Sequence, residues 1–129
     1  MGVPTPLISR LDPWAPPIAL MAIIFLLSAQ PDLNSGLGAW DTVLRKLAHM
    51  LEYGVLWFLW LRALGYRAPA PAVAAAIAAA YAATDEVHQV FVEGRHGSPL
   101  DWVIDCAGIA LAWLVWSRLR VRTTASRAR

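Results

Sequence analysis

Residues 72–92, AVAAAIAAAYAATDEVHQVFV, decide the fold class predicted for this chain. The alanine-rich part, Ala74–Ala83, does not alternate between apolar and polar residues, as a strand of a membrane β-barrel would. Only helices and closed barrels satisfy every backbone polar group in lipid, and a helix needs about 20 residues to cross the hydrocarbon core. We therefore predict a transmembrane helix here, with its charged residues, from Asp85 onward, near one end.

Three further apolar stretches fit membrane helices, and the first and last of the chain are at the short end of the range of about 17–25 residues. Connections rich in Gly and Pro separate them, and such short connections place successive helices antiparallel. We predict an all-α fold with a single domain: an up-down antiparallel four-helix transmembrane bundle, followed by a basic tail over residues 118–129. A cleaved signal peptide is the alternative for Met1–Ala29, but the small-x-small cleavage pattern is missing. The predicted helices cover Trp14–Ala29, Val43–Leu64, Ala72–Val92 and Asp101–Ser117.

The composition of the chain favours an integral membrane protein. Apolar residues make up 58% of the 129 residues and charged residues 16%, whereas soluble domains have about 45–50% and about 25%. This bias, with a mean hydropathy of +0.49, excludes a disordered chain and disfavours a soluble enzyme. The single cysteine, Cys106, excludes an intrachain disulfide and a zinc site built on several thiolates.

The basic residues are distributed unevenly between the two ends of the predicted bundle. Eight of the eleven Lys and Arg residues fall at the end that holds both termini and the connection between the second and third helices. Because Lys and Arg mark cytoplasmic ends, we expect both termini in the cytoplasm and a multi-pass protein of the inner (cytoplasmic) membrane. The arginine-rich tail accounts for the pI of about 9.1 and suits anionic lipid headgroups, so we expect a membrane lipid and no nucleic acid as partner.

Ionisable residues inside the predicted helices gather toward the other end of the bundle. They come early in the second helix, late in the third and early in the fourth, and antiparallel packing brings those segments together. Each such residue costs about 2.5–3.5 kcal/mol on membrane insertion, which favours a functional site over ion pairs that serve structure alone. The candidates are Lys46, His49 and Tyr53 of the second helix, Asp85, Glu86 and Gln89 of the third, and Asp101 and Asp105 of the fourth.

A structural role for the same charges remains the alternative. In that case they would form ion pairs and helix caps, with Asp101 capping the fourth helix and Asp41 or Thr42 capping the second. In both interpretations, the alanines of the third helix let neighbouring helices approach closely.

Three sequence strings together form a specific pattern: KLAHMLEYGVL (46–56), TDEVHQVFVEGR (84–95) and PLDWVIDCAG (99–108). The pattern resembles the VanZ-like family, over about Ile18 to Leu114, and adds Arg95 to the candidate residues. Asp105 departs from it, because Asn is common there in the family. The resemblance implies a small bacterial integral membrane protein of the cell envelope, related to resistance to the glycopeptide teicoplanin.

Two functions fit these residues. In the first, an outward-facing pocket binds a lipid headgroup, a lipid-linked cell-wall precursor or a glycopeptide. Arg95 would hold a phosphate as a fork and Lys46 as a point charge, while Asp85, Glu86 and Asp101 would orient them.

In the second, the protein is a membrane-embedded hydrolase or transferase that acts on a lipid-linked substrate. His49 would be the general base, and Asp85 or Glu86 would orient it or hold a divalent cation. Clustered carboxylates suit Mg²⁺ or Ca²⁺ better than zinc, and no motif indicates another cofactor. Ion translocation is disfavoured, because the other halves of three of the helices are wholly apolar.

Overall fold

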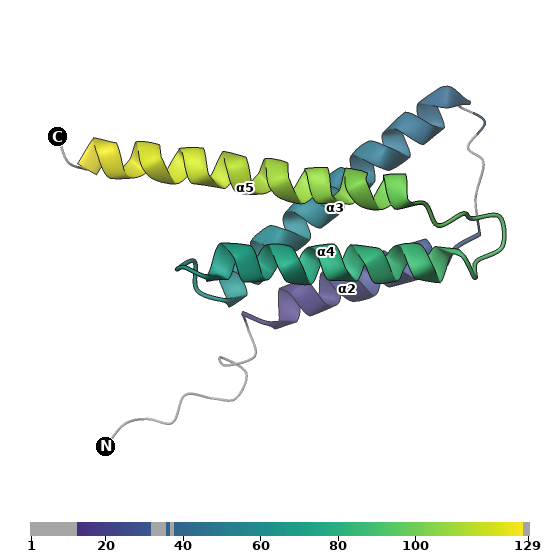
Figure 1. Cartoon of the computed structure of the whole chain (residues 1–129), viewed down its shortest axis with the longest axis horizontal. Helices are drawn as coiled ribbons and strands as arrows, with labels where there is room; N and C mark the ends of the chain where they lie inside the picture. Colours follow the sequence, from purple (N-terminus) through teal and green to yellow (C-terminus); the bar gives the residue numbers. More distant parts are fainter. Residues whose placement is uncertain (1–12, 32–35, 37, 128–129) are drawn as a thin grey trace, which may run out of the picture.

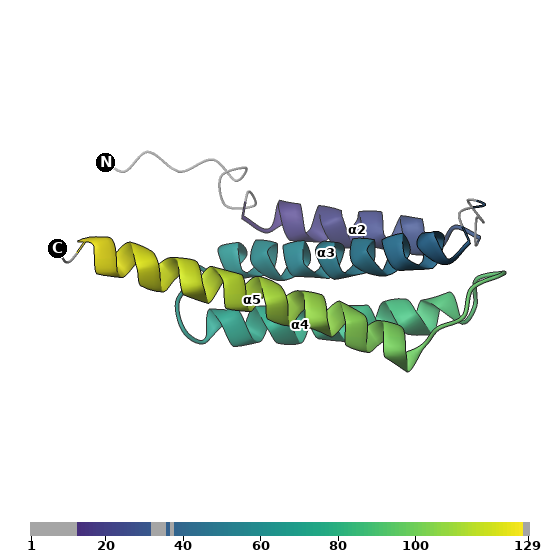
Figure 2. The ribbon, with the colours of Figure 1, turned by 90° about the horizontal axis from the view of Figure 1, so that it is seen from above.

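The computed structural model describes residues 13–31, 36 and 38–127. This part of the chain contains no strand and four helices: α2 Ala15–Ser28, α3 Ala39–Ala63, α4 Ala70–Gln89 and α5 Pro99–Arg127. Successive helices run in opposite directions, so that the start of α2, the α3–α4 connection and the end of α5 lie at one end (Figure 1). α2 packs on α3 and α4, on the side away from α5 (Figure 2). The prediction of an all-α fold with four helices is confirmed.

The last helix is longer than the sequence pattern indicates. Its apolar run ends at Ser117, but α5 continues to Arg127 through most of the predicted basic tail. Side-chain packing supports this extension, since the guanidinium carbon of Arg120 lies 4.8 Å from the centre of the Trp116 ring. The last two residues of the tail and the first twelve residues of the chain, on which the signal-peptide alternative partly rests, lie outside the described residues.

A face of small side chains lets α4 pack closely in the core. Its alanines at every fourth position are buried, and larger side chains of α3 fill the space opposite. The indole nitrogen of Trp57 donates a hydrogen bond to the carbonyl oxygen of Pro71 at 3.1 Å, which ties α3 to the start of α4. The facing residues are Ala70, Ala74, Ala78 and Ala82 of α4 and Tyr53, Leu56, Trp57 and Leu61 of α3.

The backbones of α3 and α5 approach most tightly at Gly108. A Cβ atom on Gly108 would lie 2.2 Å from the Met50 carbonyl oxygen, and one on Gly54 would lie 3.1 Å from the Gly108 carbonyl oxygen. Only glycine leaves room for this crossing, as at small-residue interfaces between membrane helices. The crossing brings His49 and Asp105, which lie close to Met50 and Gly108 in sequence, to the same place.

Several polar side chains lie inside this bundle beside its apolar core, and many large apolar side chains lie on its surface. Asp85, Gln89 and Asp105 are buried, whereas Leu51 and Phe91 are 69% and 82% exposed. By length and composition, one helix in the described part of the chain, over Pro99–Thr124, is apolar enough to cross a membrane. α2 is apolar but shorter.

Candidate functional site

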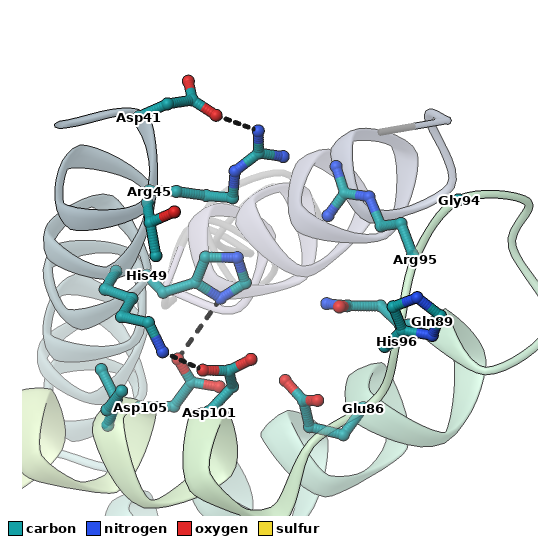
Figure 3. A pocket seen from close by; sticks show the side chains of 13 residues that line it. Asp41, Arg45, His49, Glu86, Gln89, Gly94, Arg95, His96, Asp101 and Asp105 are labelled. Atoms are coloured by element: carbon teal, nitrogen blue, oxygen red, sulfur yellow. Dashed lines mark hydrogen bonds and ion pairs between the residues drawn. The ribbon is translucent and has the colours of Figure 1, made fainter. Parts of the chain in front are cut away.

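A cavity of about 370 Å³ opens at the end of the bundle where α3 begins, α4 ends and α5 begins (Figure 3). The spacing of polar residues along the three helices predicts that they meet here, and seven of the nine candidates line this cavity. The cavity wall also includes Asp41, Arg45 and His96, and charges of both signs face the cavity. The seven are Lys46, His49, Glu86, Gln89, Arg95, Asp101 and Asp105.

One wall of the cavity contains an ion pair between α3 and α5. The Lys46 ammonium nitrogen lies 2.6 Å from a carboxylate oxygen of Asp101, and both side chains are more than one-third exposed. Asp101 is therefore not the cap of α5. The cap is the Ser98 hydroxyl, which accepts a hydrogen bond from the Leu100 amide at 3.2 Å.

The start of α3, by contrast, has no side-chain cap. The helix begins at Ala39, so Asp41 and Thr42 lie inside its first turn. Asp41 instead pairs with Arg45, four residues later, at 2.6 Å. This spacing is visible in the sequence and marks neighbours on a helix, and it is the signal that could have added Arg45 to the candidate residues.

His49 lies against Asp105 on the floor of the cavity. Its Nδ1 atom is 3.3 Å from Asp105 Oδ1, which makes an ion pair when the imidazole is protonated. Asp105 is fully buried, and its two oxygens receive no hydrogen bond from a described residue. The sequence hypothesis names Asp85 or Glu86 as the group that orients His49. The structure instead places Asp105 there, because the glycine crossing of α3 and α5 brings these two residues together.

Glu86 holds the loop between α4 and α5 in place. Its Oε2 atom accepts a hydrogen bond from the Ser98 amide at 2.7 Å. The loop lies directly on the end of α4, where a Cβ atom on Gly97 would lie 2.2 Å from the Glu86 carbonyl oxygen. The second carboxylate oxygen of Glu86 is buried and has no hydrogen-bond partner in the described part of the chain.

Arg95 connects this loop to α2. Its guanidinium donates hydrogen bonds to the carbonyl oxygens of Gln30 at 3.0 Å and Leu27 at 3.3 Å. Leu27 lies in the last turn of α2 and Gln30 lies just beyond its end, so Arg95 adds a side-chain donor to the carbonyl groups at this helix terminus. Arg95 therefore has a structural contact in addition to its place in the cavity wall.

The remaining two candidates lie deeper. Asp85 lines a smaller neighbouring cavity of about 140 Å³, and its Oδ2 atom accepts a hydrogen bond from Gln89 at 3.1 Å. Tyr53 lines neither cavity, and its fully buried hydroxyl has no hydrogen-bond partner among the residues described.

Comparison with protein families matches residues 13–120 of the chain to the VanZ/LLP1 family. The chain belongs to this family. The match spans α2, α3, α4 and most of α5, and it includes all nine candidate residues of this VanZ-like protein. Comparisons with curated proteins and with solved structures give no match.

The described residues of the VanZ-like site do not form a metal centre. No three His, Cys, Asp or Glu side chains there are placed to hold a metal ion together. The divalent cation considered from the sequence therefore stays a prediction. The chemistry that the geometry supports directly is recognition by paired charges, and proton transfer at His49 next to Asp105.

Proposed function

We propose that this VanZ-like protein crosses the inner membrane several times, with both termini in the cytoplasm, and binds the polar headgroup of an envelope lipid or of a lipid-linked cell-wall precursor. The observation that carries the proposal is the cavity of about 370 Å³, at the end of the bundle away from the described start of α2 and end of α5. Cavities of about 300–1,000 Å³ are typical of small-molecule sites. Charges of both signs in its wall suit a polar headgroup.

The buried polar and exposed apolar side chains support the membrane part of the proposal. Buried carboxylates with exposed Leu and Phe side chains suit lipid as the surrounding solvent. Labelling with a membrane-impermeant maleimide tests the orientation, in a Cys106→Ser background. Glu93→Cys, beside the cavity end, reacts in intact spheroplasts, whereas Ser126→Cys, near the end of α5, reacts only after permeabilisation. The opposite labelling pattern would overturn the orientation.

Lipid retention by the purified protein tests headgroup binding. The detergent-solubilised protein is incubated with a polar-lipid extract, with undecaprenyl pyrophosphate or with teicoplanin, and the bound molecules are quantified by native mass spectrometry. Teicoplanin is included because of the glycopeptide connection that the family resemblance implies. Lys46→Gln lowers retention about ten-fold or more, a loss of about 1.4 kcal/mol, whereas Arg67→Gln, an exposed arginine at the other end, leaves it unchanged. Equal retention by the two variants would exclude the cavity as the binding site.

A second function, hydrolysis or group transfer on a lipid-linked substrate, is favoured by one observation. His49 faces the cavity with its Nδ1 atom 3.3 Å from the buried carboxylate of Asp105, as a general base held by an acidic partner would be. The other ring nitrogen points away from Asp105, where it can accept a proton from a nucleophile (Figure 3). Release of phosphate or headgroup from these lipids, with and without Mg²⁺ or Ca²⁺, tests this function. Release by the wild type that His49→Gln abolishes supports an enzyme, and no release under any condition contradicts one.

A further inference from the structure

The smaller cavity contains polar groups whose hydrogen bonds are unsatisfied. It lies between α2, α3 and α4 and has a volume of about 140 Å³. Asp85 and Ser28 line it and are 3% and 4% exposed. Asp85 Oδ1 and Ser28 Oγ make no hydrogen bond with any described residue. Because buried polar groups in proteins are almost always hydrogen-bonded, these two atoms point to a bound group.

The acidic part of this cavity, formed by Asp85 and Glu52, suits a hydrogen-bond donor that carries positive charge. A carboxylate accepts hydrogen bonds at both oxygens. Gln89 donates to Oδ2 of Asp85, which leaves Oδ1 to a further donor, and Glu52 adds a second carboxylate to the wall. In the described chain, no three His, Cys, Asp or Glu side chains are placed to hold a metal ion together. A primary ammonium group has three N–H donors, which match Asp85, Glu52 and Ser28.

The two cavities lie on either side of a shared wall. Arg45, His49 and Arg95 line both of them. Arginine side chains are suited to phosphate, so this wall places phosphate-binding groups next to the ammonium-binding groups. The larger cavity then leads outward from the wall.

We propose that the two cavities form one site for a phosphoethanolamine headgroup, with its ammonium in the smaller cavity and its phosphate at the shared wall. This inference rests on the proposed function and names the class of headgroup. It explains why the site contains carboxylates as well as cations, since Arg45 and Arg95 suit the phosphate and the carboxylates of Asp85 and Glu52 suit the ammonium.

Competition between phospholipids tests the inference. Purified protein is exchanged into nanodiscs that contain phosphatidylethanolamine, phosphatidylcholine or phosphatidylglycerol in turn, and retained lipid is measured by native mass spectrometry. Wild-type protein retains the ethanolamine lipid about ten-fold better than the other two, because the trimethylated choline has no N–H donor and glycerol has no positive charge. Soluble phosphoethanolamine competes with the lipid, and phosphocholine does not.

Variants connect this preference to the smaller cavity. Asp85→Asn reduces the preference for the ethanolamine lipid to about two-fold or less. Ser28→Ala also weakens this preference, and it removes only a hydroxyl group and preserves the packing. Glu93→Gln, an exposed residue that lines neither cavity, keeps the full preference. Equal retention of all three lipids by the wild type would overturn this inference and leave the proposed headgroup binding intact. No retention of these three lipids would overturn this inference, and no retention of undecaprenyl pyrophosphate either would overturn the proposed headgroup binding as well.

Discussion

Gly108 of α5 rests directly on the backbone of Met50 of α3, since a methyl group on Gly108 would lie 2.2 Å from the Met50 carbonyl oxygen. His49 precedes Met50, and Asp105 lies about one helical turn before Gly108. The contact between the two candidate residues therefore depends on a backbone approach that no side chain larger than hydrogen permits. The glycine crossing sets the geometry of the site.

Enlarging the two glycines of this crossing destabilises the protein in a graded way. Gly108→Ala meets backbone atoms at 2.2 Å, so its overpacking cost lies near the upper end of about 1–3 kcal/mol and exceeds the gain of about 1 kcal/mol in helix propensity. Gly54→Ala has a smaller effect, because its Cβ atom would meet the Gly108 carbonyl oxygen at 3.1 Å. Thermal unfolding in detergent should give Gly108→Ala the lowest midpoint, with Gly54→Ala closer to the wild type. A higher midpoint for Gly108→Ala than for the wild type would contradict the close crossing.

Substitutions of His49 and Asp105 have non-additive effects on the free energy of unfolding. His49→Gln removes the one ion-pair partner that Asp105 has in the described chain and costs about 3–5 kcal/mol if the buried carboxylate stays charged. Adding Asp105→Asn to this variant restores much of the loss, because a neutral amide costs less to bury than a carboxylate. A double-mutant cycle on the free energy of unfolding measures the coupling. Strictly additive effects would show that the two side chains do not interact.

Exchange of the charges of Lys46 and Asp101 separates stability from binding. The pair is more than one-third exposed on both sides, so it contributes about 0–1 kcal/mol to stability. In Lys46→Asp/Asp101→Lys the ion pair can re-form, and the midpoint of thermal unfolding stays near that of the wild type. Lipid retention nevertheless falls about ten-fold, because the ammonium has moved to another helix. Full retention in the exchanged protein would assign the pair a structural role only.

The same substitution on two faces of α4 tests its packing. Ala78 is fully buried, and Ala78→Leu overpacks the helix interface at a cost of about 1–3 kcal/mol. Ala76 lies two residues earlier and is exposed, so Ala76→Leu changes stability by less than about 0.5 kcal/mol. Unfolding midpoints of the two variants provide the comparison. A similar loss in both would mean that the alanine face is not the packing surface.

Patterns along the sequence predict the order of the helices. They also predict which end of the bundle carries the site. Apolar stretches separated by Gly and Pro predict the four helices, and the described structure contains them as α2 to α5. The position of the polar residues along each stretch predicts that they meet at one end. The lengths are less predictable, as α5 shows, because hydropathy reports where a helix suits lipid and not where its backbone hydrogen bonds end.

The partners within the site could not be predicted in this way. Periodicity places Lys46 and His49 on one face of α3 and Asp101 and Asp105 on one face of α5, but it does not give the register between the two helices. That register depends on how closely the backbones pass at Gly54 and Gly108.

The sequence by itself determined the fold class, the family pattern and the set of polar residues at one end of the bundle, because each is a property of spacing along the chain. Only the tertiary structure decided that His49 meets Asp105, that Glu86 and Arg95 hold the loop in place, and that Asp85 faces a separate cavity. These relationships depend on distances between helices, which are set by side-chain volume and backbone approach.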